Sequence, residues 1–243
     1  DTTKHLKDRG NYIPVKAEND AKRDSQPSGK QCHLYHPYSS YYTRTTGIWQ
    51  TVWMEFVSEN YIQYIKIDTD INVPSVNINI KTPESSSAYK VSAKAYCDGK
   101  LVGEGGTTVN SWGTFVNFEM SEKHLWEVGV GNLYDLVIEL SKDGEVIDTV
   151  KSYFGLRSVA LRNGAFVLND KIVFGRWVLD QGFYPDGIYT APNDEALKND
   201  IVYSMQLGFN GARLHEKVFE PRFLYWADKL GYLVWGEQEN WGY

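Results

Sequence analysis

The stretch from residue 208 to residue 237 most constrains the fold, because it carries the pattern of two strands joined by one helix. Residues 210–215 (NGARLH) form a short run that suits a buried strand. A helix is predicted to follow, since Pro221 is favoured in a first helical turn and Gly231 is typical of a helix end. Residues 232–235 (YLVW) then suit a second buried strand. This order predicts a right-handed βαβ unit with parallel strands.

Polar side chains stand where these two strands end. Arg213 and His215 close the first strand, and Glu237 follows the second. Ligands of such folds bind at the carboxyl ends of the strands. A cation, a titratable ring and a carboxylate at that edge therefore predict a binding site.

Residues 57–155 have a different pattern, with short alternating strands and no helix. Asp98-Gly99 and Asp143-Gly144 lie between alternating runs, and Asp-Gly is typical of a tight hairpin turn. About seven strands in this span predict an immunoglobulin-like β-sandwich. The resemblance to antibody domains is one of architecture alone, because their paired cysteines are absent.

The last third of the chain alternates strands and helices. A hairpin over residues 162–171 precedes an apolar strand over 172–179 and a helix that opens at Asn193. With the βαβ unit, this order is how a (β/α)8 barrel begins. The apolar residues expected to line one side of the first helix are Leu197, Ile201, Met205 and Leu207. The residues expected to face the barrel interior are Val173, Val178, Ala212, Leu214 and Val234.

The first 40 residues are polar and irregular, and residues 41–56 then alternate aromatic, β-branched and polar side chains. That alternation predicts a strand pair or a long bulged strand. Trp49 and Trp53 would lie on one face of it, as packing residues.

Composition excludes several classes of partner. The net charge is −6, and the lysines and arginines are scattered, which argues against nucleic acid or an anionic membrane as a partner. No apolar run approaches the roughly 20 residues of a membrane span. Cys32 and Cys97 show no metal-binding spacing, and a disulfide between them stays open. We expect no cofactor and no metal, and the sequence does not indicate a compartment.

Five motifs follow one another along the chain: TGIWQTVWME (46–55), HLWEVGVGNLYDLVIEL (124–140), YFGLRSV (153–159), FVLNDKIVFGRWV (166–178) and GFNGARLH…ADKLGYLVWGE (208–237). In this order they resemble glycoside hydrolase family 2, the family of β-galactosidases, β-glucuronidases and β-mannosidases. The resemblance implies a multidomain β plus α/β chain with three parts. Residues 1–56 would be the end of a sugar-binding jelly roll, 57–155 the sandwich, and 156–243 the first three units of a (β/α)8 TIM barrel.

The resemblance also implies a reaction. Family members hydrolyse terminal β-linked sugars with retention, through two carboxylates on barrel strands later than those expected here. We therefore expect a β-galactosidase-like fragment without catalytic residues, inactive on its own. The residues expected to contact the carbohydrate substrate are Asp180, Gln181, Arg213, His215, Glu237 and Trp241.

The chain departs from the family pattern at this site. His215 lies one residue earlier than the family histidine, and the usual acidic pair becomes Gly236-Glu237. Galactosidase specificity and its magnesium ligands are therefore not implied. Loop capping by Asp180 and Gln181, and a structural ion pair at Arg213, remain open alternatives.

Two further functions remain open on the sequence alone. One is a non-catalytic carbohydrate-binding or scaffolding protein built on the sandwich, and the other is a small α+β protein of unrelated function. In the barrel interpretation, three parallel strands leave an open edge. We expect other barrel segments or a second copy of the chain to cover this edge, which predicts a homo-oligomer in the second case.

Overall fold

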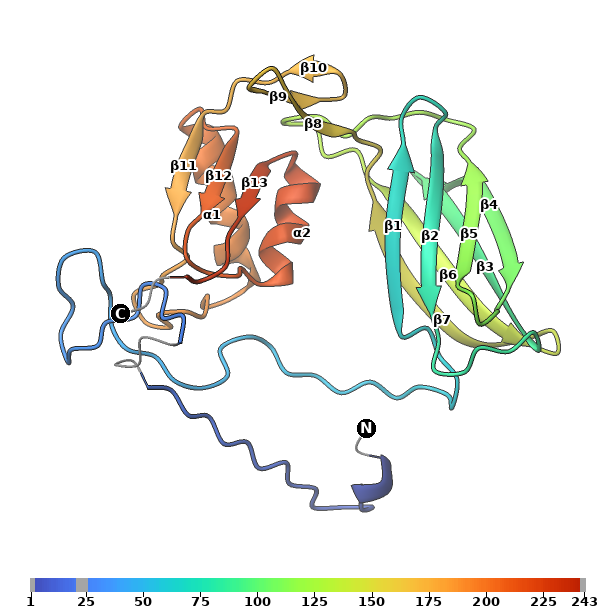
Figure 1. Cartoon of the computed structure of the whole chain (residues 1–243), viewed down its shortest axis with the longest axis horizontal. Coiled ribbons are helices and arrows are strands. Elements are labelled where there is room, and N and C mark those ends of the chain that lie inside the picture. The colour runs from blue at the N-terminus through green and yellow to red at the C-terminus, as the bar shows by residue number, and fades with distance from the viewer. Residues whose placement is uncertain (1–2, 21–25, 241–243) are drawn as a thin grey trace.

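The computed structural model describes residues 3–20 and 26–240, which form two folded parts joined by a short three-stranded region (Figure 1). One part is a sandwich of antiparallel strands, and the other is a parallel sheet with its helices. Ahead of both, after a short 3-10 helix (Thr3–His5), residues 6–20 and 26–60 run as extended segments and loops. None of the described helices is long and apolar enough to cross a bilayer.

The sandwich consists of seven strands in two antiparallel sheets, in agreement with the predicted β-sandwich. The first sheet has the order β1 (Tyr64–Asp70), β2 (Ser75–Lys81), β5 (Thr114–Glu119). The second sheet has the order β4 (Lys100–Thr108), β3 (Tyr89–Cys97), β6 (Tyr134–Lys142), β7 (Glu145–Phe154).

Alternation along each strand builds the sandwich core. In β2 every second residue is buried, and β6 follows the same rule, with Leu136, Ile138 and Leu140 at most 1% exposed. The predicted Asp-Gly turns are confirmed, since Asp98 and Asp143 have φ of 49° and 53° and connect β3 to β4 and β6 to β7. The two-residue turns thus fix the register that points these apolar residues inward.

A small sheet of three strands follows the sandwich. Its strands are β8 (Val159–Arg162), β9 (Ala165–Leu168) and β10 (Lys171–Ile172), in the order β10-β9-β8. The predicted apolar strand over 172–179 is therefore wrong in its extent. It is split, because residues 173–176 leave the small sheet before the parallel sheet begins.

The predicted βαβ arrangement is confirmed. The elements run β11 (Trp177–Asp180), α1 (Asp194–Gln206), β12 (Gly211–Leu214), α2 (Pro221–Leu230) and β13 (Leu233–Gly236). The sheet order is β11-β12-β13, and both neighbouring pairs are parallel. Figure 1 shows β12 between its two neighbours.

Capping residues set both helix boundaries. The Asn193 side chain accepts a hydrogen bond of 2.9 Å from Ala196 N, which begins α1 as predicted. Pro221 begins α2 and Gly231 ends it with φ of 72°. A side chain at Gly231 would also collide with the backbone of Val130, 2.5 Å from its Cβ position, so only glycine allows this approach. Leu207 lies beyond the end of α1 and is 78% exposed, contrary to its predicted place on the buried side.

The prediction of which residues face away from the helices is wrong by one position along each strand. Ala212 and Leu214 pack in the cluster formed with α1 and α2, and Val178 and Val234 lie against the same cluster. The opposite face carries the row Leu179, Arg213 and Trp235, which are neighbours in register. All three are exposed, and Trp235, predicted to be core, is 52% exposed. A shift of one residue exchanges the faces, because side chains alternate along a strand.

The predicted strand pair over residues 41–56 is wrong. The described residues before 60 contain only an isolated bridge, between Tyr38 and Tyr41. A strand needs a neighbour for its backbone hydrogen bonds, and no described strand lies beside this segment. Trp53 is accordingly 71% exposed, whereas Trp49 packs against Tyr189 with ring centroids 5.3 Å apart. A jelly-roll assignment for residues 1–56 stays a prediction.

The sandwich and the α/β part meet at Trp126. This side chain is 2% exposed, and its Nε1 donates a 2.6 Å hydrogen bond to Asp228 O in α2. Arg157 stacks over the indole with its Cζ 4.6 Å from the ring centroid and pairs with the Asp228 carboxylate at 2.9 Å. Asn169 donates to Trp126 O at 2.9 Å and ties the small sheet to the same point.

Candidate functional site

The carboxyl edge of the parallel sheet brings together most of the predicted site residues. Asp180, Leu214 and Gly236 are neighbours in register, and they place Gln181, His215 and Glu237 at the next position of each strand. Trp241, also expected to contact the carbohydrate, lies outside the described residues.

The Glu237 carboxylate accepts hydrogen bonds from two donors, one in β12 and one just after it. Its Oε1 accepts a hydrogen bond from Arg213 Nε, and its Oε2 accepts one of 3.2 Å from Glu216 N. Burial opposes ionisation, but the Arg213 and Glu216 hydrogen bonds outweigh it and lower the pKa of Glu237. The side chain is therefore a carboxylate at neutral pH, and it can accept hydrogen bonds but does not supply a proton.

Two buried residues, Glu216 and His215, lie beside the Arg213–Glu237 pair. Glu216 is 4% exposed, has φ of 55° and accepts a 3.0 Å hydrogen bond from Asn240 N. His215 is 8% exposed, and its backbone N donates to Asp180 O at 2.7 Å. Burial, with the nearby charges of Lys30 and Arg213, lowers the pKa of His215. The imidazole is therefore neutral at pH 7.

Loop capping and contact with the carbohydrate were the two alternatives for Asp180 and Gln181, and the two residues differ in which one they fit. Asp180 Oδ1 accepts a 2.8 Å hydrogen bond from Gly182 N, which is a loop cap, and burial raises the pKa of its carboxyl. Gln181 Oε1 is buried and accepts no hydrogen bond from the described residues. Gln181 is thus the better candidate for a ligand contact.

Lys217 belongs to this edge and was missed by the sequence. It is 1% exposed, and its Nζ donates to Gly182 O at 2.6 Å and to Tyr189 O at 2.8 Å. The rings of Trp49, Tyr189 and Phe219 surround the ammonium, with centroids 4.7, 5.2 and 4.9 Å away. Burial lowers the pKa of Lys217. A lysine after a strand resembles an ordinary loop residue, so nothing in the pattern pointed to it.

Three possible ligands for a cation also meet here. One ligand atom from each of His215, Glu216 and Glu237 lies within 4.8 Å of the others. Imidazole and carboxylate donors suit several divalent ions. Arg213 and Asn240, however, already donate to the two carboxylates. That this site binds no metal stays a prediction.

A cleft lies near the site residues. A cleft of about 750 Å³ opens nearby, between residues 16–49, the 187–190 loop and Glu239. Arg213, His215 and Glu237 do not line this cleft. They lie instead at the end of the exposed row on the sheet face that the helices leave open.

The described sandwich carries the match to a known family. Residues 60–157 match the model of glycosyl hydrolases family 2.

Curated relatives align with most of the chain. A putative beta-glucuronidase of Formosa agariphila is 26% identical over 98% of this chain and 28% of its own length. A beta-glucuronidase of Streptococcus agalactiae is 26% identical over 70% of this chain and 26% of its own. A beta-galactosidase of Lactococcus lactis is 24% identical over 80% of this chain and 19% of its own. The chain thus spans less than a third of the length of these relatives.

A solved structure supports the fold. The apo b-glucuronidase from Ruminococcus gnavus superposes with a TM-score of 0.64 at 19% identity, over 74% of this chain and 30% of that one. At this identity the likeness concerns the fold alone. The resemblance predicted from five motifs is nevertheless confirmed, since residues 60–157 match the model of glycosyl hydrolases family 2 and the relatives are named as beta-glucuronidases and beta-galactosidases.

Proposed function

We propose that the chain is part of a retaining β-glycosidase and that it supplies sugar-contacting residues rather than the catalytic carboxylates. The observation that carries this proposal is the cluster of Arg213, His215 and Glu237 at the carboxyl edge of a parallel sheet. In α/β folds this edge is where substrates bind. The family match adds that the substrate is a carbohydrate.

The parallel sheet fits the start of a (β/α)8 barrel. Both helices pack on one face of it, through Ala212 and Leu214, and the opposite face is open and carries Leu179 and Trp235. In a closed barrel that second face would point inward. We propose that further barrel segments, or a second copy of the chain, cover it.

The chemistry of the carboxylates supports a binding role. A retaining glycosidase needs one carboxyl with a raised pKa as acid and a second as nucleophile, about 5–5.5 Å apart. Glu237 has a lowered pKa, because Arg213 neutralises it. Glu216 is buried and accepts from a backbone amide. These features suit residues that accept sugar hydroxyls, and Arg213 would orient Glu237 for that contact.

The sugar is proposed only at the level of a terminal β-linked residue. Our sequence prediction favours a β-galactosidase-like enzyme, whereas the relatives carry both names, beta-glucuronidase and beta-galactosidase. The second candidate is a non-catalytic carbohydrate-binding protein. The sandwich favours this candidate, because its buried core contains no residue beyond 156 and thus none from the α/β part.

Assays with nitrophenyl β-glucuronide, β-galactoside and β-mannoside test the division of roles. We expect no turnover above the buffer rate at high protein concentration, because Glu237 has the lowered pKa of a hydrogen-bond acceptor and the family's two catalytic carboxylates are expected on barrel strands later than β13. Turnover that the Glu237→Gln variant abolishes would contradict the proposal, since it would make Glu237 catalytic.

A further inference from the structure

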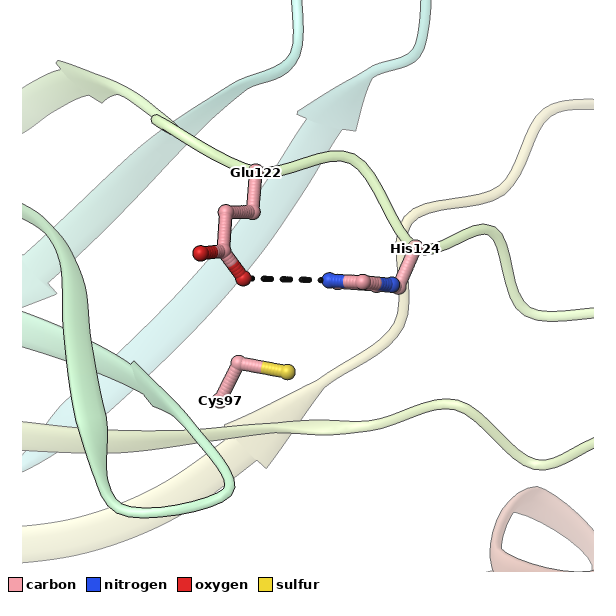
Figure 2. A group of neighbouring side chains, drawn as sticks. All are labelled: Cys97, Glu122 and His124. Atoms are coloured by element: carbon pink, nitrogen blue, oxygen red, sulfur yellow. Dashed lines mark hydrogen bonds and ion pairs between the residues drawn. The ribbon is translucent and has the colours of Figure 1, made fainter.

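A second group of polar side chains lies in the sandwich, away from the carboxyl edge of the parallel sheet. It is found where the β3–β4 hairpin meets the loop after β5. Figure 2 shows Cys97, Glu122 and His124 pointing toward a common centre. One ligand atom from each lies within 4.8 Å of the other two. Cys97 is partly buried, and the Glu122 and His124 side chains are 32% and 47% exposed, so the centre is reached from solvent.

The backbone on both sides of this centre is held in place. Tyr134, 1% exposed, accepts a 2.7 Å hydrogen bond from His124 N and donates a 3.1 Å bond to Glu122 O through the same hydroxyl. Cys97 is the last residue of β3 and pairs with Lys100 across the tight turn. The three side chains therefore project from positions that the fold fixes.

The distances suit a small tetrahedral ion. His124 Nε2 and Glu122 Oε2 are 3.2 Å apart. Two such ligands on one zinc ion, at bond lengths of about 2.0–2.2 Å and a tetrahedral angle, are about 3.4 Å apart. The cation could therefore lie between these two atoms with little movement, and Cys97 Sγ would complete three protein ligands.

The other carboxylate oxygen of Glu122, Oε1, is already paired with a lysine. Lys100 Nζ pairs with Glu122 Oε1, which leaves Oε2 toward His124. A metal ion would thus bind one carboxylate oxygen while the lysine keeps the other. Without a metal the thiol is protonated, because burial and the charge of Asp98 raise the pKa of Cys97. Formation of the sulfur–metal bond releases this proton to solvent.

We propose that Cys97, Glu122 and His124 form a site for a thiophilic divalent cation, of which Zn²⁺ is the best fit. Thiolate and imidazole donors select zinc and related ions over magnesium and calcium. Three protein ligands leave a fourth position for water. Cys97 lies far from Glu122 and His124 in the sequence, and the chain has none of the short cysteine spacings of zinc motifs, which is why the sequence did not suggest this site.

Cobalt spectroscopy on the whole chain tests this site. Titration of the chelator-treated protein with Co²⁺ should give tetrahedral d–d bands and a thiolate charge-transfer band that Zn²⁺ removes by competition. Cys97→Ser should abolish the charge-transfer band, and Glu122→Gln should weaken binding at least about tenfold. Circular dichroism checks that each variant is folded.

Cys32 provides a matched control. It is the other cysteine, and its Sγ lies 3.1 Å from His36 O and 3.2 Å from Leu34 N, in a turn that also carries histidines. Cys32→Ser should leave the spectrum unchanged, and Zn²⁺ should raise the Tm of this variant and of the wild type but not of Cys97→Ser. Absence of the band in the wild type, or its loss in Cys32→Ser alone, would overturn the proposal.

Discussion

Replacing Trp126 with alanine is expected to lower the free energy of unfolding by about 3–5 kcal/mol. The indole fills the junction between the sandwich and the α/β part, in one cluster with Leu168 and Leu233. The substitution removes that volume and leaves Asp228 O without its 2.6 Å donor. Guanidinium unfolding followed by circular dichroism gives the change directly.

Two variants separate the contributions at this junction. Trp126→Phe keeps most of the ring but removes the Nε1 donor, and it should cost an intermediate amount, about 1–2 kcal/mol. Trp112→Ala is the surface control, because Trp112 is 95% exposed, and it should change stability by no more than about 0.5 kcal/mol. An equal effect of Trp126→Ala and Trp112→Ala would show that the two parts do not depend on this contact.

The Lys217→Met variant is expected to lose about 2–4 kcal/mol of stability. Methionine fills similar space but leaves the carbonyls of Gly182 and Tyr189 buried without a donor, at about 1–3 kcal/mol each. It also leaves Glu220, whose Oε2 lies 4.0 Å from Nζ, without a nearby cation. Desolvation of the buried ammonium costs free energy in the wild type, and its removal in the variant offsets part of this loss.

Lys198→Met is the matched control, since Lys198 also pairs with a glutamate and lies over an indole, but is one-third exposed. Its change should stay within about 0.5 kcal/mol.

The pH dependence gives a second readout. Because the pKa of Lys217 is lowered in the fold, the unfolded chain binds more protons, and this contribution to stability rises with pH up to 10.5. The advantage of wild type over Lys217→Met should therefore grow as the pH rises toward 10.5, and a decrease would contradict a lowered pKa of Lys217 in the folded protein.

The local signals in the sequence predicted element type well. Asn193, Pro221 and Gly231 act through hydrogen bonds and backbone angles within a few residues, so they marked both helices correctly. The Asp-Gly turns did the same for the sandwich hairpins. Each of these features depends on near neighbours in the chain, which the sequence displays.

Features that depend on distant partners were missed or mistaken. The strand expected over residues 41–56 needed a neighbouring strand that the described chain does not provide. The predicted open face of the parallel sheet was displaced by one residue, because short strands with apolar side chains on both faces do not reveal which face the helices cover. Lys217 is surrounded by Tyr189, Phe219 and also Trp49, which lies some 170 residues earlier in the chain. The site prediction succeeded in part, since parallel strands must align their carboxyl ends.

Saturation-transfer NMR with methyl β-glucuronide and methyl β-galactoside tests most directly whether this edge contacts sugar. We expect transfer from the protein to at least one of the two glycosides. Arg213→Gln and Glu237→Gln should each weaken binding about tenfold, the effect of losing a charged hydrogen bond. Arg162→Gln is the control, because it breaks an exposed arginine–carboxylate pair, with Asp170 at 3.0 Å, in the small sheet. Binding that is lost in Glu237→Gln and kept in Arg162→Gln is the predicted result, whereas equal binding by all three variants would contradict a sugar site at Arg213 and Glu237.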